Sequence, residues 1–262
     1  MLKLPLALFL LTCAATSPSL AAAPDFNSLM GMGQKLAQHN HYPEALRCFQ
    51  QARQIAPNRW EPYWEIGDAE LTNDDCKAAV ETLTRGIELN SKSGDLYFTR
   101  GKCYQNLGEL NLAVADLTRA IALEPKNAHF YERRAFSYAA LGEYKKALAD
   151  YNKAIELDAP IKASKGVAAR APYKEYYVCL ADRARIDARL GNYQKAIDDF
   201  TAALTAPPTQ SANSMRILYE RADCYDKLGK HDLASKDRTA ATNHKGDILE
   251  DLVHDPTLGT GK

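Results

Sequence analysis

One residue type recurs along this chain in the same sequence setting and at a nearly constant spacing. Alanine fills that setting six times, at Ala45, Ala79, Ala113, Ala147, Ala196 and Ala234. The first three intervals are 34 residues each, and the next two are 49 and 38, so insertions of 15 and 4 residues account for the longer ones. A period of this length is typical of chains built from stacked copies of one supersecondary unit. The repeat therefore constrains the fold more strongly than any other feature of the sequence.

Other columns of the repeat alternate between very small and large side chains. Twelve positions before the alanines stand Gly33, Gly67, Gly101, Ala135, Ala184 and Ala222. Seven positions after them stand Ala52, Gly86, Ala120, Ala154, Ala203 and Ala241, and between these two columns lie Phe49, Leu83, Leu117, Tyr151 and Phe200. Small residues let two helices approach closely, and the large residue fills the space beside them. Arg238 replaces the large residue in the last copy, which predicts an edge exposed to water.

A short turn divides each copy into two helices. The segments LGEL, LGEY, LGNY and LGKH follow helical runs, and their glycine supplies the left-handed backbone conformation that ends a helix. Pro57, Pro125 and Pro208 stand where the second helix of a copy should stop. Each copy is therefore predicted to be a helix, a tight turn and a helix.

These columns resemble the tetratricopeptide repeat, which has the same period, the same small positions and a proline near its end. The resemblance covers about residues 26–244 and implies an all-α fold, a right-handed superhelical solenoid of six helix-turn-helix repeats. The expected repeats are 26–59, 60–93, 94–127, 128–161, 177–210 and 215–245, with an insertion at 162–176. Residues 246–262 are expected to form a C-terminal cap helix and a tail, because apolar residues from Ile248 to Val253 recur at helical spacing.

The first 23 residues differ from the repeats and read as a secretory signal peptide. Lys3 precedes the apolar run LPLALFLL, and small residues follow, with cleavage expected after Ala21, Ala22 or Ala23. The run is too short to span a bilayer, and no transmembrane span is expected after cleavage. The chain is therefore expected to be exported, periplasmic or secreted. An alternative is a lipid anchor at Cys13, although Thr12 is a poor residue before a lipid-acceptor cysteine.

One stripe of the first helices is expected to line the concave groove, as it does in the proteins that this chain resembles. The candidate partner-binding residues on this stripe are Trp64, Asp68, Phe98, Lys102, Glu132, Phe136, Arg185, Tyr219 and Asp223. Aromatic side chains with charges beside them suit an extended peptide or a partner helix. The alternative is that the rings fill gaps between adjacent repeats.

The insertion between the fourth and fifth repeats is rich in basic residues. Lys162, Lys165, Arg170 and Lys174, with Arg189 on the following helix, form a candidate basic patch. Such a patch can attract acidic proteins, anionic lipid or polyanionic glycan. The alternative is a solvated loop that only offsets the stacking of the repeats.

Catalytic and cofactor chemistry has little support in the sequence. There is no glycine-rich phosphate loop, no GxSxG elbow and no HExxH helix, so we expect no enzyme, cofactor or metal. The chain has 33 basic and 33 acidic residues, a balance that does not favour nucleic acid as a partner. Five cysteines lie beyond the signal segment and are expected to be buried thiols, although Cys76 and Cys103 fall in adjacent repeats and could form a disulfide.

These features together predict a non-enzymatic, exported adaptor. Its solenoid would bind a peptide segment or helix of a partner protein and help to assemble an envelope or secreted complex. The alternative is a structural spacer or self-associating scaffold without a specific peptide groove. Near-identical repeats also permit homo-oligomers through swapped or end-to-end pairing.

Overall fold

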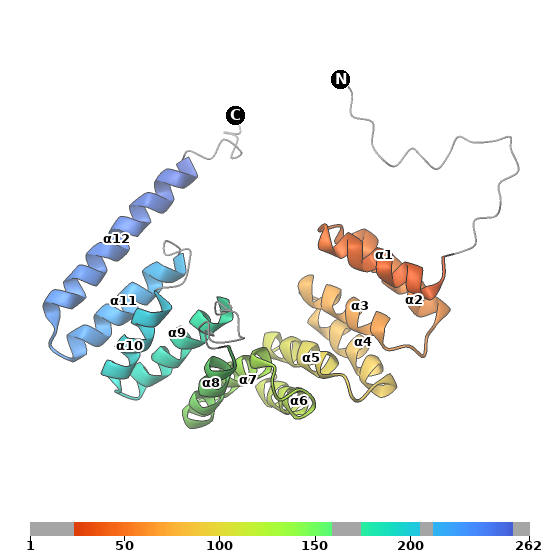
Figure 1. The fold of residues 1–262 in the computed structure, drawn as a ribbon, viewed down its shortest axis with the longest axis horizontal. Coiled ribbons are helices and arrows are strands. Elements are labelled where there is room, and N and C mark those ends of the chain that lie inside the picture. The colour runs from red at the N-terminus through yellow and green to blue at the C-terminus, as the bar shows by residue number, and fades with distance from the viewer. Residues whose placement is uncertain (1–23, 159–173, 205–211, 254–262) are drawn as a thin grey trace, which may run out of the picture. The chain divides into compact units, whose positions relative to one another are not determined.

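A computed structural model describes residues 24–158, 174–204 and 212–253, and these residues form twelve α-helices and no strands (Figure 1). In chain order the helices are α1 (Phe26–Gln38), α2 (Tyr42–Ile55), α3 (Glu61–Thr72), α4 (Cys76–Leu89), α5 (Gly94–Asn106), α6 (Leu110–Leu123), α7 (Ala128–Ala140), α8 (Tyr144–Asp158), α9 (Lys174–Arg189), α10 (Tyr193–Ala203), α11 (Ala212–Lys227) and α12 (His231–Val253). Each of the six repeats contributes one pair of helices. The predicted all-α fold of helix-turn-helix repeats is confirmed.

The turns within the pairs use the left-handed backbone conformation at a single residue. Gly108, Gly142, Gly191 and Gly229 have φ between 72° and 81°, which glycine adopts without steric cost. The first two repeats have no glycine here, and Asn40 and Asp74 take the same conformation with φ of 63°. Asparagine and aspartate tolerate it better than other non-glycine residues. All six turns therefore have one geometry in spite of their different sequences.

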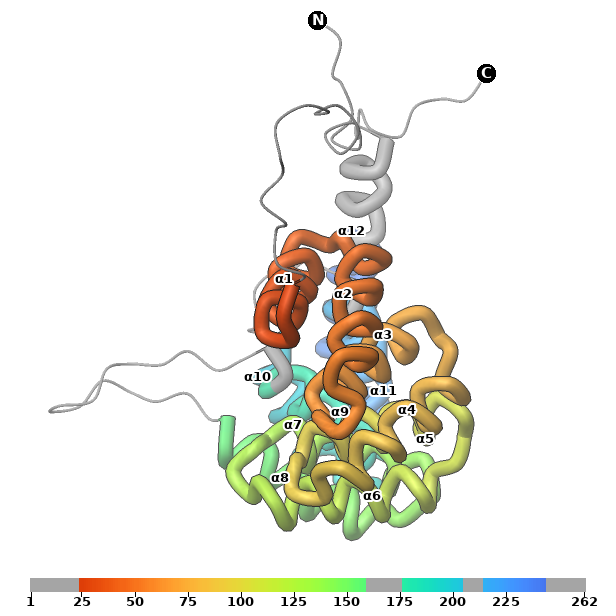
Figure 2. Tube along the Cα trace, turned by 90° about the vertical axis from the view of Figure 1, so that its right-hand side faces the viewer, coloured from red at the N-terminus to blue at the C-terminus, as the bar shows by residue number. Residues whose placement is uncertain are grey.

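The chain forms two compact parts, which divide between Asn58 and Arg59. The first part contains α1 packed against α2, and the ring of Phe49 lies where a side chain at Gly33 would stand. In the second part every helix from α3 onward packs against the next one, and Figure 2 shows the successive pairs of this part from a second side. First helices of neighbouring repeats also pack together, in the pairs α3–α5, α5–α7, α7–α9 and α9–α11.

The core consists of the columns that the repeat defined. Ala79, Ala113, Ala147, Ala196 and Ala234 are fully buried. Leu83, Leu117, Tyr151 and Phe200, from the large column, are also inaccessible or nearly so. Because each repeat has only two helices, the core is a thin continuous layer that neighbouring repeats complete for one another.

The C-terminal end differs from the expectation of a separate cap helix in residues 246–262. Residues 231–253 form one uninterrupted helix, α12, which includes the second helix of the last repeat. No proline stands between Ala234 and Val253, and the single glycine there, Gly246, costs a helix only about 1 kcal/mol. Nothing local therefore ends the helix where the repeat ends.

The disulfide considered between Cys76 and Cys103 is not formed. Both thiols are free and buried in one apolar cluster with Ala79, Leu83 and Leu96. Burial raises the pKa of the Cys103 thiol to about 12. The side chains fit this cluster as small apolar groups, which is the ordinary role of a buried cysteine.

Candidate partner-binding face

The first-helix face is the side of α3, α5, α7, α9 and α11 that carries the nine predicted partner-binding residues. Two of its four rings are packed between repeats. The indole Nε1 of Trp64 donates a hydrogen bond of 3.1 Å to Thr99 Oγ1 on α5. The ring of Phe98 lies 4.9 Å from that of Phe130 on α7, measured between centroids. Both rings therefore have a structural role at junctions between repeats, as the alternative interpretation of the stripe expected.

The other two rings are exposed. The exposed fraction is 49% for Phe136 on α7 and 45% for Tyr219 on α11. The fifth repeat lies between them in sequence, and its α9 has Arg185 in the column of Phe136 and the buried Ala181 in the column of Tyr219. The first-helix face of repeats four to six thus has two large exposed rings, with Arg185 on the repeat between them.

The charged residues of repeats five and six largely pair with one another. Arg185 forms an ion pair with Asp182 on its own helix, and its Nε lies 2.9 Å from both carboxylate oxygens of Glu220 on α11. Burial raises the pKa of Asp182, and the nearby Arg185 opposes this shift. Asp223 accepts a 2.8 Å hydrogen bond from Arg238, the residue that replaces an apolar side chain in the last repeat. These charges are neutralised locally.

The remaining predicted residues lie on repeats two to four. Asp68 on α3 and Lys102 on α5 are both half-buried, and the Lys102 ammonium lies 5.6 Å from the centre of the Phe98 ring. Glu132 on α7 is also half-buried and lies 3.8 Å from His129 Nδ1. The structure therefore places all nine residues on first helices but spreads them over five repeats.

The predicted basic patch falls mostly on residues that the structure leaves undescribed. Lys162, Lys165 and Arg170 lie outside the described residues, and Lys174 is the first residue of α9. Arg189 is exposed at the end of α9. The patch as a whole remains a prediction.

Two negative findings apply to residues 24–158, 174–204 and 212–253. In these segments no three His, Cys, Asp or Glu side chains gather in a way that could hold a metal ion. The helices of the same segments include none that is both long enough and apolar enough to cross a membrane.

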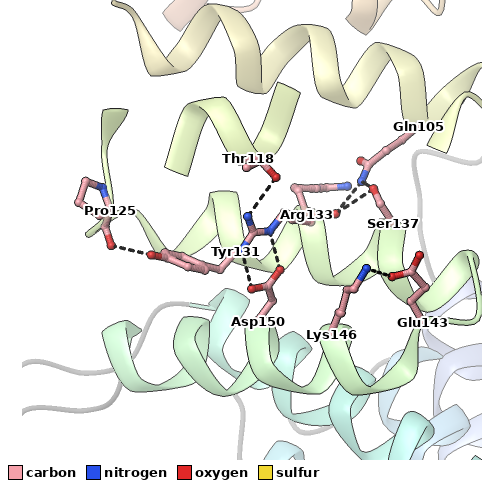
Figure 3. Close-up of polar contacts among 10 residues, drawn as sticks. Gln105, Thr118, Pro125, Tyr131, Arg133, Ser137, Glu143, Lys146 and Asp150 are labelled. Atoms are coloured by element: carbon pink, nitrogen blue, oxygen red, sulfur yellow. Dashed lines mark hydrogen bonds and ion pairs between the residues drawn. The ribbon is translucent and has the colours of Figure 1, made fainter. Parts of the chain in front are cut away.

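A ladder of four arginines, none of which the sequence analysis named as a functional residue, connects the repeats. Arg134 on α7 donates from Nε and Nη2 to the two oxygens of Asp150 on α8, at 2.7 and 2.8 Å, and from Nη1 to Thr118 on α6, at 3.1 Å. Figure 3 labels Thr118 and Asp150, and dashed lines mark these contacts. Each arginine thus joins both helices of its own repeat to the second helix of the repeat before it. The four sets are Arg100 with Asp116 and Thr84, Arg134 with Asp150 and Thr118, Arg183 with Asp199 and Asn152, and Arg221 with Asp237 and Thr201.

The ladder crosses both insertions and is absent from the first two repeats. Arg183 reaches Asn152 from the other side of residues 159–173, and Arg221 reaches Thr201 from the other side of residues 205–211. The corresponding columns hold Met32 and Cys48 in the first repeat, and Ile66 and Thr82 in the second. The sequence carried a signal for these pairs, since each arginine precedes a small-column residue and each aspartate stands 16 residues later.

Comparisons with known proteins agree with this architecture. Sequence models of the tetratricopeptide repeat match residues 30–94, 94–127, 128–159 and 181–248. The chain therefore belongs to the tetratricopeptide repeat family. Repeats of this family are protein-interaction scaffolds that bind protein partners, and the fold is typically non-catalytic. No sequence among the curated proteins matches the chain.

Solved structures with low sequence identity have the same fold. PilF of Pseudomonas aeruginosa is 14% identical, with a TM-score of 0.66 over 81% of this chain and 88% of that one. A tetratricopeptide repeat protein from Parabacteroides merdae is 18% identical, with a TM-score of 0.62 over 84% of this chain and 79% of that one. YrrB, described as a TPR protein with an unusual peptide-binding site, is 17% identical, with a TM-score of 0.54 over 82% of this chain and 93% of that one.

Proposed function

We propose that this chain is an exported, non-enzymatic adaptor that binds a peptide segment or helix of a partner protein on its first-helix face. In this role it helps to assemble an envelope or secreted complex. The N-terminal sequence supports export, and the fold supports the scaffold role. The balanced charge supports a protein partner rather than nucleic acid.

The observation that carries the proposal is the exposure of Phe136 and Tyr219. Each ring leaves close to half of its surface in water, although other rings of the same face are packed between repeats. Exposed aromatic rings provide contact area at a low cost in conformational entropy and are enriched among binding hot spots. Repeats four to six are therefore the centre of the proposed site, and Trp64 and Phe98 support its edge.

The packing of the first helices also supports a concave site on this face. Helices α3, α5, α7, α9 and α11 contact one another across repeats. Elements on the inner side of a curved stack lie closer together than elements on its outer side. A tetratricopeptide repeat protein with a peptide-binding site, YrrB, has the same fold.

A photo-crosslinking amino acid at Phe136 tests the proposal in the native compartment. We expect a discrete adduct with one partner protein, and at least about tenfold less adduct when Tyr219→Ala is added. The matched control places the crosslinker at Leu112 on α6, an exposed apolar position on a second helix. Equal adducts from both positions, or none from Phe136, would contradict the proposal.

A spacer or self-associating scaffold is the second candidate, and the packing of Trp64 and Phe98 favours it. In that case the crosslinker at Phe136 yields only the dimer of this chain or no adduct. Sedimentation equilibrium of the purified protein then distinguishes a self-associating scaffold from a monomeric spacer.

A further inference from the structure

The turns of the fifth and sixth repeats form an exposed edge that combines leucines with positive charge. Leu190, Leu228 and Leu233 have exposed fractions of 45%, 40% and 40%. The turns are neighbours, because Lys230 Nζ on the later turn donates a 3.0 Å hydrogen bond to Gln194 Oε1, at the start of α10 just after the earlier turn. We call this surface the basic leucine edge.

Five exposed cations lie within a few residues of these leucines in the sequence. They are Arg189, Lys195, Lys227, Lys230 and Lys236, and the exposed acids of the same turns are Asp198 and Asp232. Two further acids, Asp223 and Asp226, already pair with Arg238. The edge therefore carries a clear excess of positive charge, although the whole chain has none.

The third repeat shows that the fold does not require this combination. Leu107 and Leu112 occupy the columns of Leu228 and Leu233 and have exposed fractions of 38% and 48%. The columns of Lys227, Lys230 and Lys236, however, hold Asn106, Glu109 and Ala115 in that repeat. Exposed leucines thus also occur at these columns in the third repeat, whereas the cations of the edge belong to the fifth and sixth repeats.

We infer that the basic leucine edge docks on an anionic lipid surface. Cations beside exposed leucines match a membrane surface, where headgroups supply negative charge and the acyl region accepts apolar side chains. The leucines stand at helix ends and turns, so a bilayer can accept them together, whereas a protein partner would need a separate pocket for each one. This docking uses a surface other than the first-helix face and does not depend on the proposed peptide site.

Tryptophan fluorescence tests the inference at the edge itself. Leu228→Trp in the full chain is mixed with phosphatidylcholine vesicles that contain or lack phosphatidylglycerol, with brominated lipid as the quencher. We expect a blue shift and quenching only with the anionic vesicles. Lys227→Glu with Lys236→Glu should weaken partition at least about tenfold, because each cation near such a surface strengthens binding.

Leu107→Trp is the matched control, since it places the same probe in the same column without the cations. Both variants keep the same N-terminal segment and the native Trp60 and Trp64, so only their difference reports on the edge. Leu233→Trp replaces Leu228→Trp if the latter disturbs the turn, as judged by circular dichroism. Equal signals from Leu228→Trp and Leu107→Trp, or quenching that ignores lipid charge, would overturn the inference. The inference would also be overturned if the probe never responded to vesicles and the charge-reversed variant instead lost binding to an acidic protein partner.

Discussion

At the scale of single residues, the small column of the first helices shows how closely the repeats pack. A Cβ atom at Gly67 would lie 2.5 Å from Leu83 Cγ, and one at Gly101 would lie 3.1 Å from Leu117 Cγ. From the fourth repeat onward the same column holds alanine, which is fully buried at Ala135, Ala184 and Ala222. The room beside this column therefore differs between repeats, and the second repeat has no space for the methyl group that the later repeats accommodate.

Gly67→Ala should destabilise the protein in spite of alanine's higher helix propensity. The added methyl group must displace Leu83, and overpacking of this kind costs about 1–3 kcal/mol. Gly31→Ala is the matched control within α1, because a Cβ there meets nothing within 4 Å, and it should stabilise the helix by up to about 1 kcal/mol. Urea denaturation followed by circular dichroism measures the change in the free energy of unfolding for both variants. Changes of the same sign would contradict the packing argument.

Asp182 should give the stability a distinct dependence on pH. Because burial raises its pKa in the folded state, the folded protein binds this proton more tightly than the unfolded chain does. The free energy of unfolding should therefore fall as pH rises from the ordinary value near 3.8 through the raised pKa. Asp182→Asn cannot titrate and should remove that fall. Identical pH profiles for the wild type and the variant, from thermal unfolding, would show that this carboxylate is not perturbed.

At the scale of helices, the arginine ladder determines how one pair meets the next. Each arginine donates three hydrogen bonds to acceptors on two second helices. The rotation of its first helix is therefore specified by hydrogen bonds as well as by apolar contacts. Half-buried, bidentate pairs of this kind have a stronger directional preference than exposed ion pairs. The ladder therefore helps to hold the residues of the first-helix face at regular positions from α5 to α11.

A double-mutant cycle on Arg134 and Asp150 tests the energetic role of one rung. Asp150→Leu should lower the free energy of unfolding by about 3 kcal/mol, because it leaves the half-buried guanidinium without its carboxylate. Arg134→Met is the other single variant of the cycle. Arg134→Met with Asp150→Leu should recover part of that loss. The exposed pair Lys153–Glu156 is the control, and its removal should cost less than about 1 kcal/mol. Additive effects at Arg134 and Asp150 would show that the rung has no coupling energy.

At the scale of the whole molecule, the stacking of the repeats and the proposed export rest on separate parts of the chain. The ladder contacts across residues 159–173 and 205–211 show that repeats remain stacked where the period is interrupted. The proposed export rests instead on the sequence of the first 23 residues, which precede the predicted repeats. The two properties therefore need separate measurements.

If the chain is exported, intact mass spectrometry of protein from the producing cells should find a mature N-terminus at Ala22, Ala23 or Pro24. The small residues before these positions suit the signal peptidase, and the apolar run before them suits the translocation machinery. A chain that keeps Met1 would contradict export through this segment. A diacylated N-terminus at Cys13 would instead show the lipid-anchored alternative.

Much of the fold was predictable because it repeats. Ala79 and Leu83 are buried as the columns predicted. The same local pattern returns in each copy, so the core positions can be recognised by comparing the copies with one another. The site was less predictable, since Trp64 and Phe136 belong to the same stripe and yet differ in exposure. Trp64 finds Thr99 on the next repeat, and neighbours of this kind differ from one junction to another. The sequence analysis also did not predict that α12 continues from the last repeat to Val253. This continuation depends on the absence of a local stop signal, which is harder to recognise than a stop signal that is present.

The sequence by itself determined the unit, its two helices, its turns and the columns of its core, because the residues that specify them recur in the same register in each copy. Only the tertiary structure decided which rings stay exposed, which charges neutralise one another and which arginines bridge two repeats. Those outcomes depend on contacts between side chains about 16 to 35 residues apart, as in the Arg134–Asp150 and Trp64–Thr99 pairs. A stripe on one helix specifies the direction in which its side chains point. The neighbouring repeat then decides whether a side chain in that direction contacts water or protein.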